Sequence, residues 1–478
     1  MWSLLELSVA VAETLLMLVC AYAAYRMVGL LVAPLASVPG PWHTRITGAV
    51  HFAALLRGTS WAYVAELHRI YGPIVRLGPN TISITDANAV RLVMSSHRFR
   101  KSDIYRVAQF GGESNIVTER DPVLHKSRKK IIAPAFSSVA MASLEPIILD
   151  VGINKLVAAI EAQSAGGASV DLRKLLVGMT LDVMGAVAFG SSFDMLGAAT
   201  HPITSWVYEA LIFAFGRFVF GNKLAALLLP KHKRGETALV QYATRMIERR
   251  RRLEHPPQDV LQSLISAIDK NTGQGLPSAH VGGSATTSTT LVWAMILLFE
   301  RPECMARLVA EIVEASPQID EPITHAKVYR LPYLNAVLRE VLRMRSPTST
   351  GLPRVTPRGG TVLCNLLIPG GTDIIVSPYA VNNDIRNYEM PSLFNPDRWL
   401  VASKSGSETS RIDMSFSTGV RACLGQNLAW LELRVALATL LRKFKFELLP
   451  GQDLRPKLLV LLQPADAKLV VTVSRRDS

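Results

Sequence analysis

One cysteine of this chain stands where its sulfur could be activated. Cys423 lies in the segment FSTGVRACLG, residues 416–425, directly before a periodic apolar stretch that predicts a helix from about Gly425 to Phe444. A cysteine at a helix N-terminus is close to unpaired N–H donors and to the positive end of the helix dipole, and both stabilise a thiolate. The other three cysteines lie far apart, which excludes a disulfide scaffold and a cysteine-rich zinc site.

The neighbours of Cys423 suit contact with a flat ligand. Gly419 and Gly425 allow the backbone a close approach, while Arg421 offers a cation. Phe416 can pack beside the sulfur. A lone cysteine at a helix start is more often structural, but the spacing F-x-x-G-x-R-x-C-x-G is very specific. It resembles the heme-thiolate signature of the cytochrome P450 family, which implies that Cys423 is the axial ligand of a heme b iron and that Phe416, Gly419 and Arg421 belong to the cofactor-binding loop.

Two more segments resemble the part of that family which braces the heme loop. Residues 340–343, EVLR, place an acid and an arginine on one helix face, and residues 395–399 read NPDRW. An E-x-x-R pair alone is usually a surface ion pair. In combination with the second segment it resembles the family's lock of one glutamate and two arginines. The resemblance implies that Glu340, Arg343 and Arg398 form a buried network with a structural role.

A basic segment resembles the family's binding site for the heme propionates. In residues 125–130, HKSRKK, His125 matches that pattern, and the cation that follows is either Lys129 or its neighbour Arg128. Lysine pairs with an anion as a point charge and lacks the planar fork of arginine. Arg354 is similar to the family's third propionate contact. The alternative interpretation is a basic helix face, which could dock an acidic electron-donor protein.

Residues 282–287, GGSATT, resemble the family's oxygen-activating helix. The resemblance implies that Thr286 is catalytic and helps to deliver protons. Ala285 stands where the family carries an acid, so a carboxylate relay is missing at this position. The alternative for the threonines of this stretch is hydrogen bonding to carbonyls of their own helix.

The stretch before Gly282 is shorter than in the family. Residues 276–282 leave room for only a short connection, and about ten residues, on the order of 15 Å of helix, are absent. Two explanations stay open. Either a gene-model or splice deletion removed this half helix, in which case the chain as written can be inactive, or the substrate pocket is rebuilt.

The N-terminus predicts a membrane anchor. Residues 14–36 are apolar apart from Arg26, long enough to span a bilayer, and the leading charges Glu6 and Glu13 argue against a cleaved signal peptide. Basic residues follow the segment, which favours a cytosolic catalytic part. We therefore expect a single-pass anchor over residues 1–36 and a heme-thiolate monooxygenase domain over residues 37–478, located at the endoplasmic reticulum membrane.

Composition and periodicity agree with one large catalytic unit. The 478 residues are 49% hydrophobic and carry a net charge of +14. Helical periodicity dominates residues 120–250, 303–315 and 331–345, whereas residues 73–86 predict a β-hairpin and residues 352–380 short strands. The fold class is therefore mainly α with a minor β part, as in the P450 fold. The basic run at 248–252 is interpreted as a solvated helix face. Nucleic-acid binding is not expected, because no aromatic residues interleave with the basic ones.

The function implied by the resemblance is insertion of one oxygen atom from O₂ into a lipophilic small molecule. The implied partners are an NADPH-cytochrome reductase and the membrane, and weaker resemblances at residues 39–42, 68–80 and 378–384 indicate a membrane-bound fungal type in secondary metabolism. Two alternatives remain: a heme-thiolate isomerase or dehydratase that needs no O₂ activation, and a variant made inactive by the gap at residues 276–282.

Overall fold

The computed structural model describes residues 13–14, 17–18, 20–21, 35–197, 201–256, 259–266, 284–405 and 412–476. The expected membrane anchor falls almost entirely outside these residues, and so does the shortened stretch at 276–282. The mainly helical class with a minor β part is confirmed. The helices are α2 (Ala49–Arg57), α3 (Ser60–Tyr71), α4 (Ala87–Ser95), α5 (Pro122–Ile132), α6 (Ser138–Ile148), α7 (Lys155–Gln163), α8 (Leu172–Phe189), α9 (Ile203–Leu228), α10 (Pro230–Arg251), α11 (Val260–Ser266), α12 (Ser284–Phe299), α13 (Pro302–Ala315), α14 (His325–Val328), α15 (Pro332–Met344), α16 (Pro378–Asn382), α17 (Asp397–Ser405) and α18 (Gln426–Lys443).

Short strands and tight helical turns complete the chain. The strands are β1 (Ile74–Gly78), β2 (Thr81–Ile84), β3 (Arg100–Lys101), β4 (Val170–Asp171), β5 (Leu352–Val355), β6 (Thr361–Leu363), β7 (Leu366–Ile368), β8 (Asp373–Val376), β9 (Phe444–Leu448), β10 (Pro456–Leu458), β11 (Leu462–Pro464) and β12 (Val470–Arg475). The 3₁₀ turns used below are η1 (Trp42–Arg45), η2 (Asp103–Ala108) and η8 (Gly419–Arg421).

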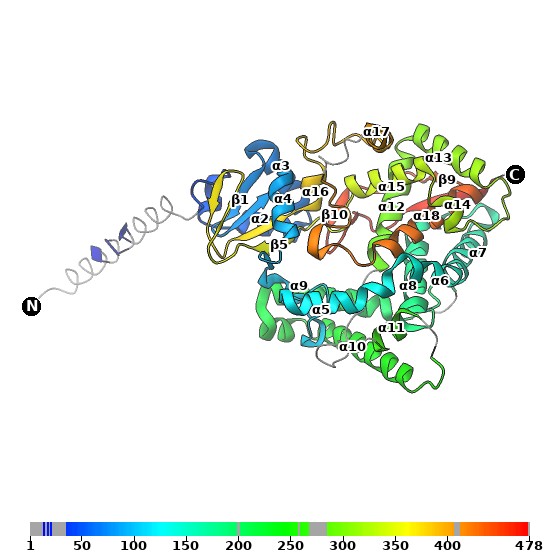
Figure 1. Ribbon diagram of the computed structural model, residues 1–478, viewed down its shortest axis with the longest axis horizontal. Helices are drawn as coiled ribbons and strands as arrows, with labels where there is room; N and C mark the ends of the chain where they lie inside the picture. The colour runs from blue at the N-terminus through cyan, green and yellow to red at the C-terminus, as the bar shows by residue number, and fades with distance from the viewer. Residues whose placement is uncertain are drawn as a thin grey trace, which may run out of the picture.

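The main sheet lies at one end of the molecule and joins distant parts of the chain (Figure 1). Its strand order is β1-β2-β8-β5-β3, with the predicted hairpin β1–β2 at one edge. The strand β3 pairs with β5 in an antiparallel register that sets Lys101 opposite Arg354 and Arg100 opposite Val355. Since successive side chains of a strand point to opposite faces, Lys101 and Arg354 share one face of this sheet.

The helical part holds the largest core, to which α8, α12, α15 and α18 all contribute (Figure 1). The helix α18, which follows Cys423, is buried over most of its length from Leu428 to Arg442. Trp293 of α12 is fully buried, and its indole N–H donates to the Leu462 carbonyl at 2.8 Å. The two helices that carry Thr286 and follow Cys423 are therefore fixed in one packed unit.

The predicted elements agree closely with the structure, with one correction on the basic run. Arg250, expected on a solvated face, is only 5% exposed and forms a bidentate pair with Asp259, with both N–O distances 2.8 Å. An arginine buried in this way needs a buried acid. The sequence run of like charges hid that partner, because Asp259 lies beyond the end of α10.

Candidate active site

The loop before α18 presents Cys423 with its backbone already constrained. The Cys423 amide donates to the Phe416 carbonyl at 2.9 Å, and the Phe416 ring packs beside that of Trp430 at 5.8 Å between centroids. The Gly425 amide donates to the sulfur. Cys423 itself remains exposed. The loop therefore offers a sulfur ligand outward, with a hydrogen-bond donor already directed at it.

The expectation of a stabilised thiolate is only half correct. The Gly425 hydrogen bond lowers the pKa of Cys423, as the helix-start argument requires. Partial desolvation raises the pKa by more, so the net direction for the protein atoms alone is upward. A thiolate at this position thus needs a positive partner in addition to the helix terminus.

The two glycines of the loop have different reasons to be glycine. Gly419 has φ +71°, and a Cβ there would lie 2.3 Å from the Met94 carbonyl oxygen. Gly419 thus allows close packing of η8 against α4, and its contact with a flat ligand stays a prediction. A Cβ on Gly425 would meet no atom of the described residues within 4 Å. The open side of Gly425 fits the close approach of a planar group.

Positive side chains from three distant segments converge beside this loop. Lys101 and Arg354 come from the paired strands β3 and β5, Arg421 from η8, and His125 from α5. Lys101, Arg354 and His125 are 5%, 2% and 4% exposed. We call these four residues the cationic cluster. The Nδ1 atom of His125 is buried without a hydrogen-bond partner among the residues that the structure describes.

The mutual repulsion of these groups shows in their pKa values. Burial, with repulsion from Arg421 and Arg354, lowers the pKa of Lys101 to about 6. Burial, with repulsion from Arg354, lowers the pKa of Arg421 to about 10. Burial, with repulsion from Arg421, Lys101 and further cations, lowers the pKa of His125 to about 3. Lys101 and His125 therefore lose their protons more readily than in water, and an anion bound beside the cluster would favour their charged forms.

The Glu119 carboxylate, which lies near both Lys101 and Arg421, is already engaged. It accepts from Arg128 at 2.9 Å, from the Ser114 hydroxyl at 2.8 Å and from the Asp121 amide at 2.8 Å. Arg128 is therefore directed at Glu119. Lys129 instead donates to the Val420 carbonyl of the cysteine loop at 3.1 Å. Of the two candidate cations, Lys129 lies beside the loop and Arg128 beside the acid.

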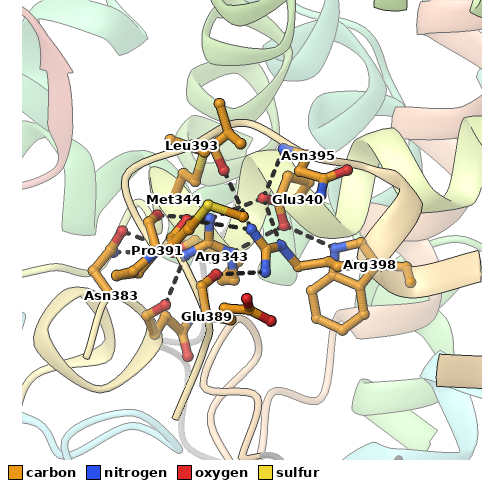
Figure 2. Close-up of polar contacts among 12 residues, drawn as sticks. Glu340, Arg343, Met344, Asn383, Glu389, Pro391, Leu393, Asn395 and Arg398 are labelled. Atoms are coloured by element: carbon orange, nitrogen blue, oxygen red, sulfur yellow. Dashed lines mark hydrogen bonds and ion pairs between the residues drawn. The ribbon is translucent and has the colours of Figure 1, made fainter. Parts of the chain in front are cut away.

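The predicted lock of one glutamate and two arginines is confirmed (Figure 2). Both carboxylate oxygens of Glu340 accept from Arg343, at 2.8 and 2.9 Å, and one of them also accepts from Arg398 at 3.0 Å. The Asn395 amide and the Trp399 indole complete the acceptor's partners at 3.0 and 2.9 Å. With Glu340 and Arg343 at 0% exposure, every charge here is paired and hydrogen-bonded, as a buried charge requires.

The lock is connected to the cysteine loop by two short links. Arg343 donates to the Asn382 carbonyl at 2.8 Å, and the Asn382 side-chain oxygen accepts from the Met414 amide at 3.0 Å. The Tyr388 hydroxyl donates to the Ile412 carbonyl at 3.0 Å. Because residues 412–416 lead directly into the loop, the lock fixes the entry of the segment that presents Cys423.

The threonines of α12 divide into two groups. Thr289 donates to the Ala285 carbonyl at 2.7 Å, and Thr290 donates to the Thr286 carbonyl at 2.9 Å. Both therefore bond to carbonyls of their own helix, which is the alternative given above. Thr287 does not: its hydroxyl donates to the buried Glu432 of α18. Thr286 is half-buried in the first turn of α12.

These observations together fit a heme. The exposed sulfur of Cys423 is a suitable axial ligand, the open side of Gly425 admits a planar group, and the cationic cluster with the orphan His125 nitrogen suits two carboxylates. Lys101 and Glu119 were missed in the sequence. In the sequence, Lys101 is only a basic residue of a two-residue strand. Its role in the cluster can be recognised only once its pairing with Arg354 is known.

Comparisons with known proteins agree over nearly the whole chain. The family described as Cytochrome P450 matches residues 38–471. The chain is 33% identical over 442 residues to Cytochrome P450 monooxygenase atr2 of Stereocaulon alpinum, covering 87% of this chain and 86% of the relative. It is 31% identical over 459 residues to Cytochrome P450 monooxygenase helB3 of Aspergillus fumigatus, covering 91% and 90%.

The fold comparison is consistent with this. The crystal structure of the cytochrome P450DA heme domain superposes with a TM-score of 0.80 at 21% identity, covering 92% of this chain and 97% of that one. The family implies a heme cofactor and a redox partner. With the sulfur-bearing loop, the lock and the cationic cluster in place, the chain belongs to the cytochrome P450 family of monooxygenases.

Proposed function

We propose that this protein is a membrane-bound monooxygenase that holds heme b through Cys423 and inserts one oxygen atom from O₂ into a lipophilic small molecule of fungal secondary metabolism. The observation that supports the proposal is the cationic cluster beside the exposed Cys423, which suits a ligand that carries both carboxylates and a metal ion. Heme bound to a thiolate supplies the chemistry of O₂ activation.

Each site residue has a defined task under this proposal. Cys423 binds the iron, with the Gly425 amide orienting its sulfur. Lys101, Arg354, Arg421, His125 and Lys129 neutralise the propionates, while Arg128 holds Glu119 away from them. Phe416 shields the sulfur beside Trp430, and Gly419 lets the loop pack on α4. Thr286, on the first turn of α12, holds a proton for the reacting face through its hydroxyl.

The membrane location rests on an exposed apolar surface, as well as on the expected anchor. In the described part of the chain, one helix, α9, is long and apolar enough to cross a bilayer, or two spans exist if the bent pair 122–136 and 138–163 counts as one. Arg217 of α9 forms a buried ion pair with Glu236 of α10 at 3.0 Å, which favours α9 lying on the domain and not crossing the membrane. Its unpacked side exposes Phe220, Leu224 and Leu227.

A second apolar element adjoins this side of α9. The turn η1 and the helix α2 expose Trp42, Ile46 and Val50, and a ring contact of 5.8 Å between Phe52 and Phe218 joins α2 to α9. The expected anchor, residues 1–36, immediately precedes this region. A surface of this kind suits immersion in lipid headgroups and acyl chains. Removal of residues 1–34 is therefore expected to weaken, but not abolish, binding to phospholipid vesicles.

The proposed electron donor is an NADPH-cytochrome reductase with an acidic docking face. Lys126 and Lys130 are exposed on α5, on the same helix as His125. A cavity of about 800 Å³ close to this helix is lined by four arginines and a single acid: Arg98, Arg100, Arg120, Arg358 and Asp103. A positive surface steers an acidic partner toward it. NADPH-dependent turnover separates this proposal from the isomerase or dehydratase alternative, which needs no reductase.

The first experiment is the reduced carbon-monoxide difference spectrum of the full chain. A strongly red-shifted Soret band is expected in the wild type and is expected to be absent in Cys423→Ser. Cys304→Ser is the matched control, because Cys304 lies in α13 and interacts with Tyr333, away from the loop. A band that survives in Cys423→Ser contradicts the assignment of the ligand. A wild type without the band, restored by about ten residues inserted before Gly282, identifies the short stretch as the defect.

A further inference from the structure

A buried carboxyl group connects the two helices on either side of the proposed heme. Glu432 lies on the second turn of α18 and is 4% exposed; Thr287 lies on the first turn of α12 and is also 4% exposed. The Thr287 hydroxyl donates to Glu432. The neighbouring hydroxyls of Thr289 and Thr290 bond to carbonyls of α12 itself. Thr287 is thus the hydroxyl of this stretch that reaches across to α18.

The donor and the acceptor of this hydrogen bond belong to the two helices that are associated with Thr286 and Cys423. Thr287 directly follows Thr286, the proposed proton-holding residue. Glu432 is carried by the helix that starts just after Cys423. A single hydrogen bond therefore relates the position of α12 to the helix that follows the sulfur ligand. The apolar core that α12 and α18 share tolerates sliding better than a directional bond does.

The carboxyl group holds its proton more firmly than an exposed glutamate does. Burial raises the pKa of Glu432 to about 8, and the Thr287 hydrogen bond opposes this only in part. The helix α12 has no ionisable side chain between Ala285 and Phe299. On α18 itself, Arg434 binds Asn335 and Arg442 binds the Ser316 carbonyl. On the helices that pack against α18, Glu145 accepts from the His325 amide, Glu311 accepts from the Tyr333 and Leu334 amides, and Arg343 binds Glu340.

We propose that Glu432 is a positioning residue, which as a neutral acid ties the first turn of α12 to α18 through Thr287 and so fixes where Thr286 stands relative to the Cys423 loop. The inference rests on the proposed function in one respect, namely that Thr286 acts at the heme held by Cys423. Ionisation of Glu432 would place a carboxylate in the core with one hydroxyl as its partner. Such a charge draws in water or displaces its surroundings, so the first turn of α12 loosens at alkaline pH.

The test measures hydrogen–deuterium exchange of the amides of Thr289–Trp293 in the heme-loaded full chain, at pH 6.5 and at pH 9.5. Three variants accompany the wild type. Glu432→Gln keeps an acceptor but cannot ionise, and Thr287→Val removes the donor at constant shape. Thr290→Val removes a buried hydroxyl of the same helix that bonds only within α12, and is the matched control.

The expected differences in amide exchange depend on the hydrogen bond between Thr287 and Glu432 and not on the stability of α12 as a whole. After correction for intrinsic exchange, the wild type exchanges about tenfold faster at the higher pH, the factor that corresponds to one hydrogen bond to a buried group. Glu432→Gln stays slow at both pH values, Thr287→Val is fast at both, and Thr287→Ser restores the wild-type pattern. An infrared band of a protonated carboxyl group, lost in Glu432→Gln and titrating in the wild type near pH 8, reports the same group.

Two results would overturn the inference. One is a Glu432→Gln variant whose exchange keeps the pH dependence of the wild type. The other is a Thr290→Val control that loosens α12 as much as Thr287→Val does. The carbon-monoxide spectrum of the same samples tests the proposed function separately. If the red-shifted band is absent but the expected exchange differences are observed, heme-thiolate ligation is contradicted. The hydrogen bond between the two helices is then still supported.

Discussion

Replacing Lys101 by methionine is expected to change heme retention and the stability of the heme-free protein in opposite directions. Lys101 is 5% exposed and faces Arg354 across β3 and β5, with Arg421 close by. Its partners from the protein are the carbonyls of Ile116 and Val117. Without an anion the amine has lost its proton at neutral pH, since its pKa lies at about 6.

The magnitude follows from the difference between the folded and unfolded pKa values. At pH 7.4 an unfolded lysine keeps its proton, because its ordinary pKa is 10.5. Holding the amine neutral about three pH units below that value costs about 4 kcal/mol. The two hydrogen bonds to carbonyls return about 2 kcal/mol. Methionine removes both effects, so the heme-free variant is expected to gain about 2 kcal/mol.

The sign of the pH dependence is fixed by the same values. Between about pH 6 and pH 10 the unfolded chain binds one proton more at this position than the folded heme-free chain does. The stability of the heme-free wild type therefore rises with pH in this window. A propionate beside Lys101 restores its charge, so heme binding takes up a proton near pH 7.4 in the wild type. Lys101→Met should show neither effect.

Heme transfer to excess apomyoglobin and denaturant unfolding of the heme-free chain measure the two halves of this prediction. Loss of one charge-assisted bond, about 1.5–3 kcal/mol, corresponds to about 10- to 150-fold faster heme loss. Lys130→Met, which changes an exposed lysine on α5, is the control. Heme loss from Lys101→Met at the wild-type rate would refute the argument that Lys101 faces a propionate.

Three further substitutions test other parts of the site. Glu340→Gln leaves Arg343 and Arg398 buried without their acid and is expected to cost about 3–5 kcal/mol and to lower the heme content, measured by thermal unfolding and by heme absorbance per chain. Gly419→Ala places a Cβ against the Met94 carbonyl at positive φ and is expected to reduce heme incorporation, whereas Gly359→Ala, where a Cβ meets no described atom within 4 Å, is expected to leave it unchanged. Arg250→Met isolates the buried Asp259 and should destabilise the fold by about 3–5 kcal/mol, with the loss largely reversed in the double variant Arg250→Met/Asp259→Leu; no reversal would show that the pair is not the cause.

The sequence was most informative where the chemistry is local. The loop around Cys423 and the helix α18 could be predicted because the spacing of the loop and the apolar period of the helix are both contained in one short segment. The lock needed two segments, but its residues are specific enough that their co-occurrence indicated the network. The choice between Arg128 and Lys129 could not be made in the same way. It depends on Glu119, whose position beside Arg128 is set by the fold.

Residues whose partners lie outside their own helix or strand were the ones that sequence analysis missed or misread. Lys101 acquires its role from a strand register with Arg354, and Glu432 from the packing of α18 against α12. Arg250 looked like one member of a solvated basic run until the fold set Asp259 beside it. In each case the local sequence is compatible with a surface position, and only long-range burial makes the group unusual.

The same reasoning changes what the net charge of +14 means. An excess of lysine and arginine indicates anionic partners, and taken over the whole chain it points to acidic membranes or acidic proteins. Part of that excess is not on the surface: Lys101 and Arg354 are buried, beside Arg421 and near the Glu119 carboxylate, which already has three partners. Until an anion is bound, burial and the neighbouring cations oppose protonation of Lys101, whose pKa they lower to about 6. The cluster therefore makes the heme-free fold less stable and the heme-bound fold more so, which is why heme retention and heme-free stability should respond oppositely when one of these charges is removed.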